Sequence, residues 1–438
     1  MSNLEKTIID RTKSICPVCK NNIEADVVEE NGSVWLKKSC VLHGSFKAKI
    51  AKYGWYYKEL DRFYKLIHAG RPICNPKNTR IYLFYPTFNC GLKCKICFSD
   101  SRKVNNDMPL EEIEKMVRAL REPRRNIFML GGEPTSREDI SEIIKIIIRA
   151  GHRPFLVTNG IKLGDIDYLR KLKKSGLNLV IMWVDSLSDE NVYELIRGEK
   201  LLSKKLKALD SLRLLGISTG IVKVVVRGIS EGGIGEIVDF AREHSFISSI
   251  VIRSYSDLGR KSFSSQGEFT IDELVEMISK ETKGLITLEE FFLFQKISYV
   301  MRVFLLNRPA CYIKQYIFIP KKGRGKKMRE MLDLRKAADY LKEFEEIYAD
   351  SPLRAKIYFM EKTLSCLTRN PGFPYSMAKQ VIYPNLRDYF RLVATSFYTP
   401  YTYDMNKTQT QCYYGWLPNY NSGKPGSFCS LLIDGHSC

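Results

Sequence analysis

From residue 80 to residue 257 the sequence alternates between short apolar runs and longer amphipathic segments. The apolar runs have the length of strands and lie at 80–88, 126–130, 153–160, 178–185, 220–228 and 249–257. The amphipathic segments between them have the length of helices. Strands that alternate with helices in this way pair in parallel, and six such units form an α/β fold, a partial (β/α)6 barrel that is open at one side.

The composition agrees with a folded protein of two or three domains. The chain has 438 residues, of which 44% are hydrophobic and 27% charged. No apolar run has the length of a transmembrane helix, and the N-terminus does not have the pattern of a signal peptide, so we expect a cytoplasmic protein. Twelve cysteines in such a protein favour metal binding over disulfide bonds.

The net charge of +20 results from 69 Lys and Arg against 49 Asp and Glu. A positive field of this kind favours anionic partners such as nucleic acid or an anionic membrane surface. A solvated basic surface, as in heat-adapted proteins, explains the same numbers. The charge alone therefore identifies no partner.

An N-terminal segment has the ligand spacing of a zinc ribbon. Cys16 and Cys19 are two residues apart, and Cys40 and His43 repeat this spacing on the far side of a predicted hairpin that turns at 31–32. The alternative is two pairs of buried cysteines without a metal. Zinc and a single iron, as in a rubredoxin-like knuckle, both accept this ligand set.

A second cysteine motif directly follows the first predicted strand of the barrel. Cys90, Cys94 and Cys97 have the spacing CxxxCxxC. Three thiolates can bind three irons of a cubic 4Fe-4S cluster and leave the fourth iron open to a substrate. A zinc knuckle with a distant fourth ligand is the alternative, but a Gly-Gly-Glu turn at 131–133, after a helix and a strand, favours the cluster.

These motifs resemble the radical S-adenosylmethionine superfamily. The resemblance implies that S-adenosylmethionine binds the open iron and that a one-electron donor, such as a ferredoxin or flavodoxin, reduces the cluster. A 5'-deoxyadenosyl radical then removes hydrogen from an unactivated C–H bond. It also implies that Gly131, Gly132 and Glu133 bind the amino group of S-adenosylmethionine. The residue before the third cysteine is usually aromatic in this superfamily; here it is Ile96, and Phe98 is expected to take part of its role near the adenine.

Polar residues at or near the carboxyl ends of the later strands are further candidates for cofactor binding, because barrel enzymes hold their chemistry at this edge. They are Thr158, Asn159, Asp185, Arg227 and Arg253. Each of them is equally compatible with a loop residue that makes local hydrogen bonds.

A narrower resemblance is to the archaeal tetraether lipid synthases and their relatives. Segments 16–46, 196–217 and 398–430 are similar to that branch. The resemblance implies radical C–C coupling of archaeal membrane lipid chains and auxiliary iron-sulfur clusters. The branch usually carries a cysteine-rich segment before the radical motif, whereas this chain has only Cys74 there.

An auxiliary 4Fe-4S cluster would take four cysteine ligands. The candidates are Cys74, Cys412, Cys429 and Cys438. Scattered core cysteines are the alternative. Cys311 and Cys366 lie in apolar segments, which favours a packing role for both.

The alternating pattern stops near residue 266, and 328–350 has the pattern of an amphipathic helix. We therefore predict a metal-knuckle domain with a linker at 1–77, the barrel at 78–265, and a C-terminal α+β extension at 266–438. This extension would bind substrate or an auxiliary cluster.

Three functions compete. The leading hypothesis is an enzyme that opens C–H bonds of archaeal lipid chains, bound peripherally at the cytoplasmic membrane face, with the basic loop 321–327 near headgroup phosphates. The second is a radical enzyme that modifies RNA or a peptide. The third, a nucleic-acid-binding protein with structural clusters, requires neither an open iron nor the Gly-Gly-Glu turn, and nucleic acid is the less favoured partner.

Overall fold

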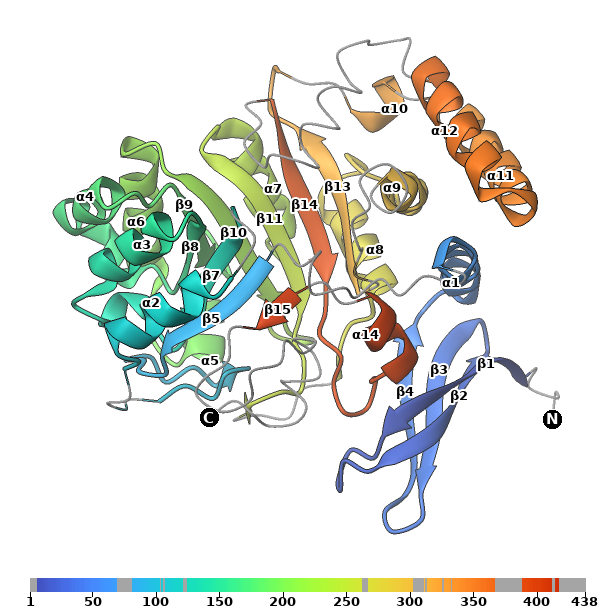
Figure 1. The fold of residues 1–438 in the computed structure, drawn as a ribbon, viewed down its shortest axis with the longest axis horizontal. Coiled ribbons are helices and arrows are strands. Elements are labelled where there is room, and N and C mark those ends of the chain that lie inside the picture. The colour runs from blue at the N-terminus through green and yellow to red at the C-terminus, as the bar shows by residue number, and fades with distance from the viewer. Residues whose placement is uncertain are drawn as a thin grey trace. The chain divides into compact units, whose positions relative to one another are not determined.

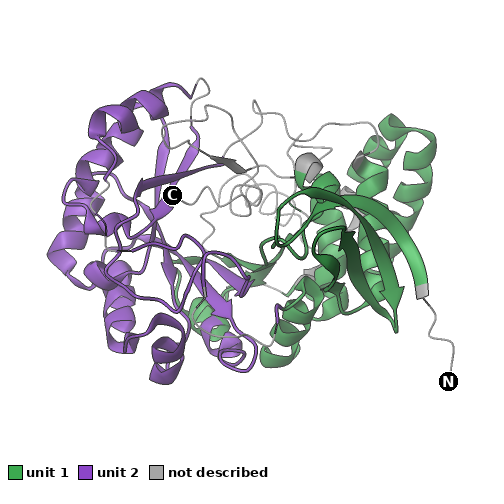
Figure 2. Cartoon of the chain, turned by 90° about the horizontal axis from the view of Figure 1, so that it is seen from below, with its two compact units in different colours: residues 1–74, 238–248, 269–412 green, residues 75–237, 249–268, 413–438 purple. Residues whose placement is uncertain are grey.

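The computed structural model describes most of the chain, namely residues 6–68, 81–102, 104, 107–120, 124–261, 267–301, 311, 313–324, 327–331, 333–366, 388–411 and 414–416. The chain forms two compact units (Figure 2). The first contains residues 1–74, 238–248 and 269–412, and the second contains residues 75–237, 249–268 and 413–438.

The first unit begins with an antiparallel sheet of four strands in the order β1-β2-β3-β4. The strands are β1 (Lys6–Ile15), β2 (Asn22–Glu30), β3 (Ser33–Cys40) and β4 (Gly44–Ala51). Asn31 and Gly32 have φ of 52° and 73°, the left-handed conformation that a tight hairpin turn requires. The predicted hairpin is therefore confirmed. Val27, Val34 and Leu36 form its small buried core.

The rest of the first unit consists of helices and a two-stranded antiparallel ladder. The ladder joins β13 (Lys314–Pro320) to β14 (Tyr389–Thr395). The helices are α1 (Gly54–His68), α8 (Ile271–Glu281), α9 (Leu288–Val300), α10 (Met328–Met331), α11 (Leu334–Asp350), α12 (Pro352–Cys366) and α14 (Met405–Gln411). The predicted helix at 328–350 is two helices, because the Asp333 carboxylate accepts from the Lys336 N–H and so caps a new helix, α11.

The second unit contains the predicted parallel sheet. Its strands are β5 (Ile81–Thr87), β7 (Asn126–Gly131), β8 (Arg153–Thr158), β9 (Leu179–Trp183), β10 (Ser218–Val225) and β11 (Ile247–Ser254, whose first two residues count with the first unit). The order is β11-β10-β9-β8-β7-β5, and the pairs from β5 to β10 are parallel. A short strand that the sequence did not predict, β15 (Tyr414–Trp416), pairs with β5. The parallel sheet is confirmed, and its curvature into a partial barrel stays a prediction.

Helices connect these strands. They are α2 (Leu110–Arg118), α3 (Ile140–Arg149), α4 (Ile166–Lys174), α5 (Glu190–Arg197), α6 (Leu202–Leu214) and α7 (Ile234–Glu243). Figure 1 shows α2, α3, α4 and α6 along one face of the strands. The carboxylate of Asp189 accepts from the Asn191 N–H and starts α5, and Gly198, with φ of 77°, ends it. Asp189 and Gly198 therefore set the two ends of α5, the helix that supports the cysteine motif.

The basic loop that was expected to bind headgroup phosphates begins with a buried lysine. Lys321 Nζ donates hydrogen bonds to the carbonyl oxygens of Ala241, His244 and Ile247 at 2.6, 2.8 and 2.6 Å. These carbonyls lie at and just after the end of α7, where a helix leaves its last acceptors unsatisfied. The expectation that Lys321 binds headgroups is therefore wrong. Its neighbour Lys322 pairs with Glu243 at 2.8 Å, and Lys326 lies outside the described residues.

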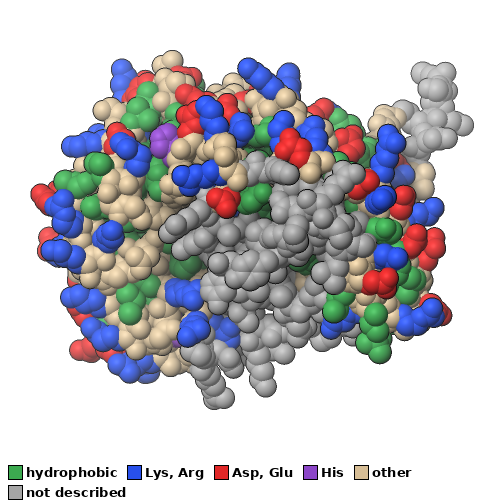
Figure 3. All heavy atoms as spheres, turned by 90° about the horizontal axis from the view of Figure 1, so that it is seen from above, with side chains coloured by type: hydrophobic (Ala, Val, Ile, Leu, Met, Phe, Trp, Pro, Cys, Tyr) green, Lys and Arg blue, Asp and Glu red, His purple; other side chains and the backbone are tan. Residues whose placement is uncertain are grey.

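On the face shown in Figure 3, Lys and Arg side chains are spread among acidic ones instead of gathering in one patch. This distribution agrees with a solvated basic surface. Among the described helices, none is both long enough and apolar enough to span a bilayer.

We expect Lys321→Met to lower the free energy of unfolding by about 1–3 kcal/mol, because three buried carbonyl oxygens lose their charged donor. The matched control is Lys322→Met, which removes only an exposed ion pair and should stay within about 0.5 kcal/mol of wild type. Urea unfolding of both variants measures the difference. Equal stability of the two variants would contradict the buried role of Lys321.

Candidate functional site

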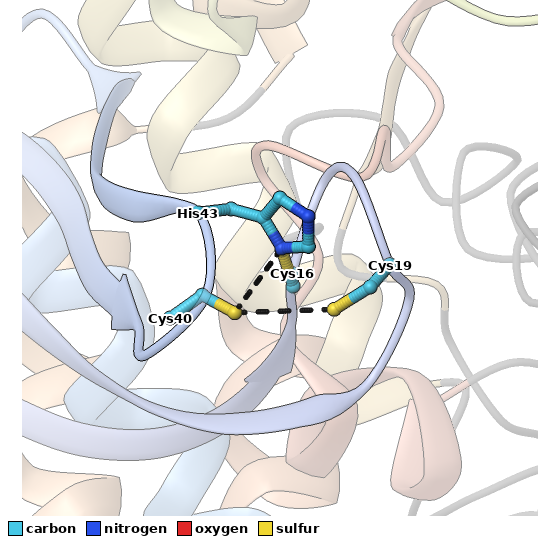
Figure 4. Close-up of side chains that lie close together, drawn as sticks. All are labelled: Cys16, Cys19, Cys40 and His43. Carbon is cyan, nitrogen blue, oxygen red and sulfur yellow. Dashed lines mark hydrogen bonds between the residues drawn. The ribbon is translucent and has the colours of Figure 1, made fainter.

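Two knuckles of the four-stranded sheet bring four metal-binding side chains together (Figure 4). Cys16 and Cys19 lie between β1 and β2, and Cys40 and His43 lie between β3 and β4. The distances are 3.9 Å from Cys19 Sγ to Cys40 Sγ, 3.5 Å from Cys40 Sγ to His43 Nδ1, and 3.6 Å from Cys16 Sγ to His43 Nδ1. All four ligand atoms lie within 4.8 Å of one another.

This geometry fits a single tetrahedral ion. With metal–sulfur and metal–nitrogen bonds of roughly 2.3 and 2.0–2.1 Å, the edges of the tetrahedron measure about 3.5–3.8 Å. Burial alone raises the pKa of the Cys16 thiol, but hydrogen bonds from the backbone of Cys19 and Val18 lower it to about 6. The surroundings of Cys16 therefore favour the thiolate that a metal requires. Zinc and iron both remain compatible with it.

The metal-binding sheet also holds a distant segment of the first unit. The buried Lys38 Nζ donates to Ser14 Oγ at 2.9 Å and to Pro400 O at 2.6 Å. Ser14 Oγ in turn donates to Tyr403 O at 2.6 Å. These buried bonds join β1 and β3 to the segment before α14, so the ribbon anchors part of the C-terminal chain.

In the second unit, helix α5 and the turn after it support the cysteine motif. The Lys95 N–H donates to Ile196 O at 2.9 Å. Cys90 and Cys94 pack against a buried apolar group. Its members are Leu92, Tyr193 and Leu201. The loop therefore rests on the C-terminal end of α5.

A second support of the cysteine motif is the segment Gly259–Lys261, which we call the strap. Strand β12 (Arg260–Lys261) pairs with β6 (Ile96–Cys97). The Arg260 guanidinium donates to Asp100 Oδ1 at 3.1 Å and to Cys94 O at 3.4 Å, and it also donates to Ser101 O. Gly259 has φ of +66°, and a Cβ there would lie 2.3 Å from Cys97 O. The sequence analysis did not predict that Gly259 and Arg260 hold the cysteine motif. The only signal for them in the sequence is the Gly-Arg pair after the last predicted strand.

The three thiols of this motif are a different donor set from the ribbon ligands. Among the described residues, the side chains grouped closely enough to share one metal ion are the four ribbon ligands. A cubic cluster instead binds each of its thiolates to a different iron. Burial raises the pKa of Cys90 to about 12, so its thiolate requires a positive centre such as iron. A donor set of three thiolates fits a 4Fe-4S cluster with one open iron.

The Gly-Gly-Glu turn lies against the chain just before Cys90. The Gly132 N–H donates to Thr87 O at 3.0 Å, and the Glu133 N–H donates to Asn89 O at 2.7 Å. A Cβ on Gly132 would lie 2.3 Å from Asn89 O, and Gly131 has φ of +113°. Both glycines are therefore required for the backbones to approach this closely.

The Glu133 carboxylate is the centre of a buried hydrogen-bond network. Its Oε1 accepts from Thr135 N at 3.1 Å, Thr135 Oγ1 at 2.7 Å and Thr158 Oγ1 at 2.6 Å, and its Oε2 accepts from Asn159 N at 2.7 Å. A carboxylate has about four acceptor positions. Glu133 therefore joins the ends of β7 and β8, and Thr158 and Asn159 act on the site through it. Binding of the amino group of S-adenosylmethionine by Glu133 stays a prediction.

The ion-pair partner of the Asp185 side chain is an arginine. Its side chain is fully buried and forms a bidentate ion pair with Arg197, with distances of 2.7 and 2.9 Å. Burial alone would raise the pKa of Asp185, but the charge of Arg197 outweighs it and keeps the pKa below its usual range. The sequence analysis did not predict this ion pair, and a role of Asp185 in cofactor binding stays a prediction.

Trp183, at the end of β9, was also missed and is surrounded by predicted site residues. The guanidinium carbons of Arg197 and Arg253 each lie 5.5 Å from the centre of its ring, and the Phe98 ring lies 6.2 Å away. Cations over an aromatic face are attracted to it. Phe98 and Arg253 therefore belong to one aromatic and cationic cluster at the carboxyl edge of the sheet.

Ile96 lies in the motif itself and is buried in an apolar group against which Trp183 also packs. Arg227 donates to Glu268 O at 3.5 Å. The proposed auxiliary ligands Cys74, Cys412, Cys429 and Cys438 lie outside the described residues. Cys311 is partly buried.

Two family models match the chain. Residues 84–241 match the radical SAM superfamily, and residues 8–52 match the HMPTM N-terminal zinc ribbon domain. The site residues from Cys90 to Arg227 lie within the first match, and all four ribbon ligands lie within the second.

Three curated relatives illustrate the similarity. The chain is 31% identical over 373 residues to the 7,8-dihydro-6-hydroxymethylpterin dimethyltransferase of Methanocaldococcus jannaschii, which covers 77% of this chain and 74% of that protein. It is 30% identical over 235 residues to a probable GTP 3',8-cyclase of Thermococcus kodakarensis, covering 51% of this chain and 70% of the relative. A probable GTP 3',8-cyclase of Pyrococcus abyssi is 33% identical over 199 residues, covering 44% of this chain and 58% of the relative.

We expect Cys16→Ala to lose the ribbon metal and to lower the thermal midpoint, because metal ligation stabilises a small sheet with little core. Loss of the metal should also expose the segment around Tyr403 to proteolysis. The matched variant is His43→Cys, which replaces the imidazole with another good ligand and should retain the metal. Metal analysis and limited proteolysis measure both effects, and a Cys16→Ala protein with unchanged metal content would contradict the assigned ligand set.

We expect Glu133→Gln to lower the free energy of unfolding by about 1–3 kcal/mol, because an amide nitrogen cannot accept the buried bonds of one carboxylate oxygen. Glu138→Gln changes an exposed carboxylate five positions later and should alter stability by at most about 0.5 kcal/mol. Chemical denaturation compares the two. If both variants match wild type, the Glu133 network has no structural role.

Proposed function

Because the chain belongs to the radical SAM superfamily, we propose that Cys90, Cys94 and Cys97 hold its 4Fe-4S cluster and that its substrate is a reduced pterin, from a carbon of which the 5'-deoxyadenosyl radical takes a hydrogen atom. Enzymes of this superfamily use a 4Fe-4S cluster and S-adenosylmethionine as cofactors. Together they supply a 5'-deoxyadenosyl radical that removes hydrogen from an unactivated C–H bond.

The choice of a pterin as the substrate rests on how much of this chain each relative matches. The match to the pterin dimethyltransferase includes 77% of this chain, whereas the matches to the two cyclases include 51% and 44%. The ribbon match carries the same enzyme family in its name. The long match therefore supports a pterin more strongly than a nucleotide.

Residues of the chain are suited to hold a cofactor and a flat substrate. The strap and α5 fix the cysteine loop, and the close approach of Gly132 to Asn89 fixes the position of the Gly-Gly-Glu turn beside it. Trp183 and Phe98 offer aromatic surface near the third cysteine, and planar rings stack on such surfaces. We assign adenine or pterin stacking to this cluster.

The lipid substrate expected from the narrower sequence resemblance has less support. The three relatives above are a pterin enzyme and two nucleotide cyclases, and the loss of Lys321 as a headgroup ligand removes one argument for it. The lipid chain remains the competing substrate in the experiment that follows.

The test is transfer of deuterium from substrate to cofactor. Anaerobically reconstituted enzyme receives S-adenosylmethionine, a low-potential one-electron reductant and 6-hydroxymethyl-7,8-dihydropterin that is deuterated at its non-exchangeable carbon positions. We expect the pterin to increase formation of 5'-deoxyadenosine and to place deuterium in it, because the radical takes its hydrogen from the substrate carbon. Mass spectrometry measures the label.

A parallel reaction contains a deuterated isoprenoid ether lipid in vesicles. Deuterium from the lipid and none from the pterin would replace the pterin proposal with the lipid one. Formation of 5'-deoxyadenosine without label from either substrate would refute both substrates while retaining the enzyme class.

A further inference from the structure

Two buried cations lie beside the cysteine motif. Lys205, on α6, is 1% exposed, and its Nζ donates to Asn159 O. Arg197, at the end of α5, is 8% exposed. Tyr193 links Lys205 to the motif, because it packs in the group that contacts Cys94 and its ring lies 5.9 Å from Lys205 Nζ.

The two cations differ in their anionic partners. Arg197 has the bidentate ion pair with Asp185. Lys205 has a carbonyl oxygen as its acceptor and, among the described residues, no ion pair with a carboxylate. A fully buried ammonium without a counter-charge is strongly unfavourable. Lys205 is therefore a buried cation without an ion-pair partner among the described side chains.

The cysteine motif is the anionic group that these cations face. Arg197 directly follows Ile196, whose carbonyl oxygen accepts from the Lys95 N–H of the motif at 2.9 Å. Lys205 Nζ lies 5.9 Å from the Tyr193 ring, against which Cys94 packs. Burial, together with the repulsion from Arg197, lowers the pKa of Lys205 to about 8, whereas Asp185, Cys94 and Glu133 act in the opposite direction. A cubic cluster with three thiolate ligands is anionic and gains one more negative charge when it is reduced.

We propose that Lys205 and Arg197 are the counter-charges of the iron-sulfur cluster at Cys94, that they raise its reduction potential, and that Asp185 positions Arg197. The inference rests on the proposed function, because it requires the cluster at Cys90, Cys94 and Cys97. A nearby positive charge stabilises the reduced state more than the oxidised one, since the reduced state is more negative. Asp185 is then a positioning residue that acts on the cluster through Arg197.

The primary test is a redox titration of the reconstituted cluster without S-adenosylmethionine, followed by electron paramagnetic resonance. Lys205→Met and Arg197→Gln each remove one buried positive charge, and we expect both to shift the midpoint potential to more negative values. Lys204→Met makes the same change on the neighbouring, exposed residue of α6 and should leave the potential unchanged, because solvent and salt screen an exposed charge. Arg197→Lys keeps the charge and should restore most of the wild-type potential.

Thermal unfolding with and without the cluster gives a second readout. In the cluster-free protein, Lys205→Met removes a buried ammonium that has no ion-pair partner among the described side chains, so we expect its thermal midpoint to equal or exceed that of wild type. The increase in midpoint on loading the cluster should be smaller in the variant than in wild type.

The outcomes separate three cases. An unchanged potential in both Lys205→Met and Arg197→Gln, with weaker binding of S-adenosylmethionine, would overturn the inference, because the cofactor carboxylate would then be the counter-charge. A shift that Lys204→Met reproduces would also overturn it. Wild-type protein that assembles no cluster at these cysteines would refute the proposed function itself.

Discussion

The site depends on one close approach of two backbone segments. At the end of β7, Gly132 lies so near Asn89 that a single methyl group would collide with its carbonyl oxygen, and the N–H groups of Gly132 and Glu133 complete hydrogen bonds to the chain before Cys90. Parallel strands bring their carboxyl ends to one edge, but only the two glycines allow the motifs that follow β5 and β7 to touch. The cysteine motif and the Gly-Gly-Glu turn are therefore one structural unit.

Buried polar groups extend this unit across the sheet. Glu133 joins β7 to β8, and the pair of Asp185 with Arg197 joins the end of β9 to α5, on which the cysteine loop rests. Each bond is made in a buried environment, where a polar group that lost its partner would cost about 1–3 kcal/mol. The residues proposed to hold the cofactors thus belong to the same network that holds the second unit's sheet together at this edge.

The sequence predicted the features that depend on local pattern. The alternation of apolar runs and helices identified the parallel sheet, and ligand spacing identified the ribbon, whose four ligand atoms do meet. It did not predict Arg260, Lys205 or Trp183, because their roles arise from tertiary contacts between segments far apart in the chain. Lys321 was misjudged for the same reason: a basic run has the composition of an exposed loop, but its first lysine is buried against the end of α7.

The central claim is that the three cysteines after β5 hold the cluster at which S-adenosylmethionine is cleaved. The most direct measurement is the iron content and the reductive cleavage activity of protein in which Cys90, Cys94 and Cys97 are all changed to Ala. We expect this triple variant to lose one 4Fe-4S cluster and all 5'-deoxyadenosine formation, while the ribbon metal remains bound. Cleavage of S-adenosylmethionine by the triple variant would show that these cysteines do not hold that cluster.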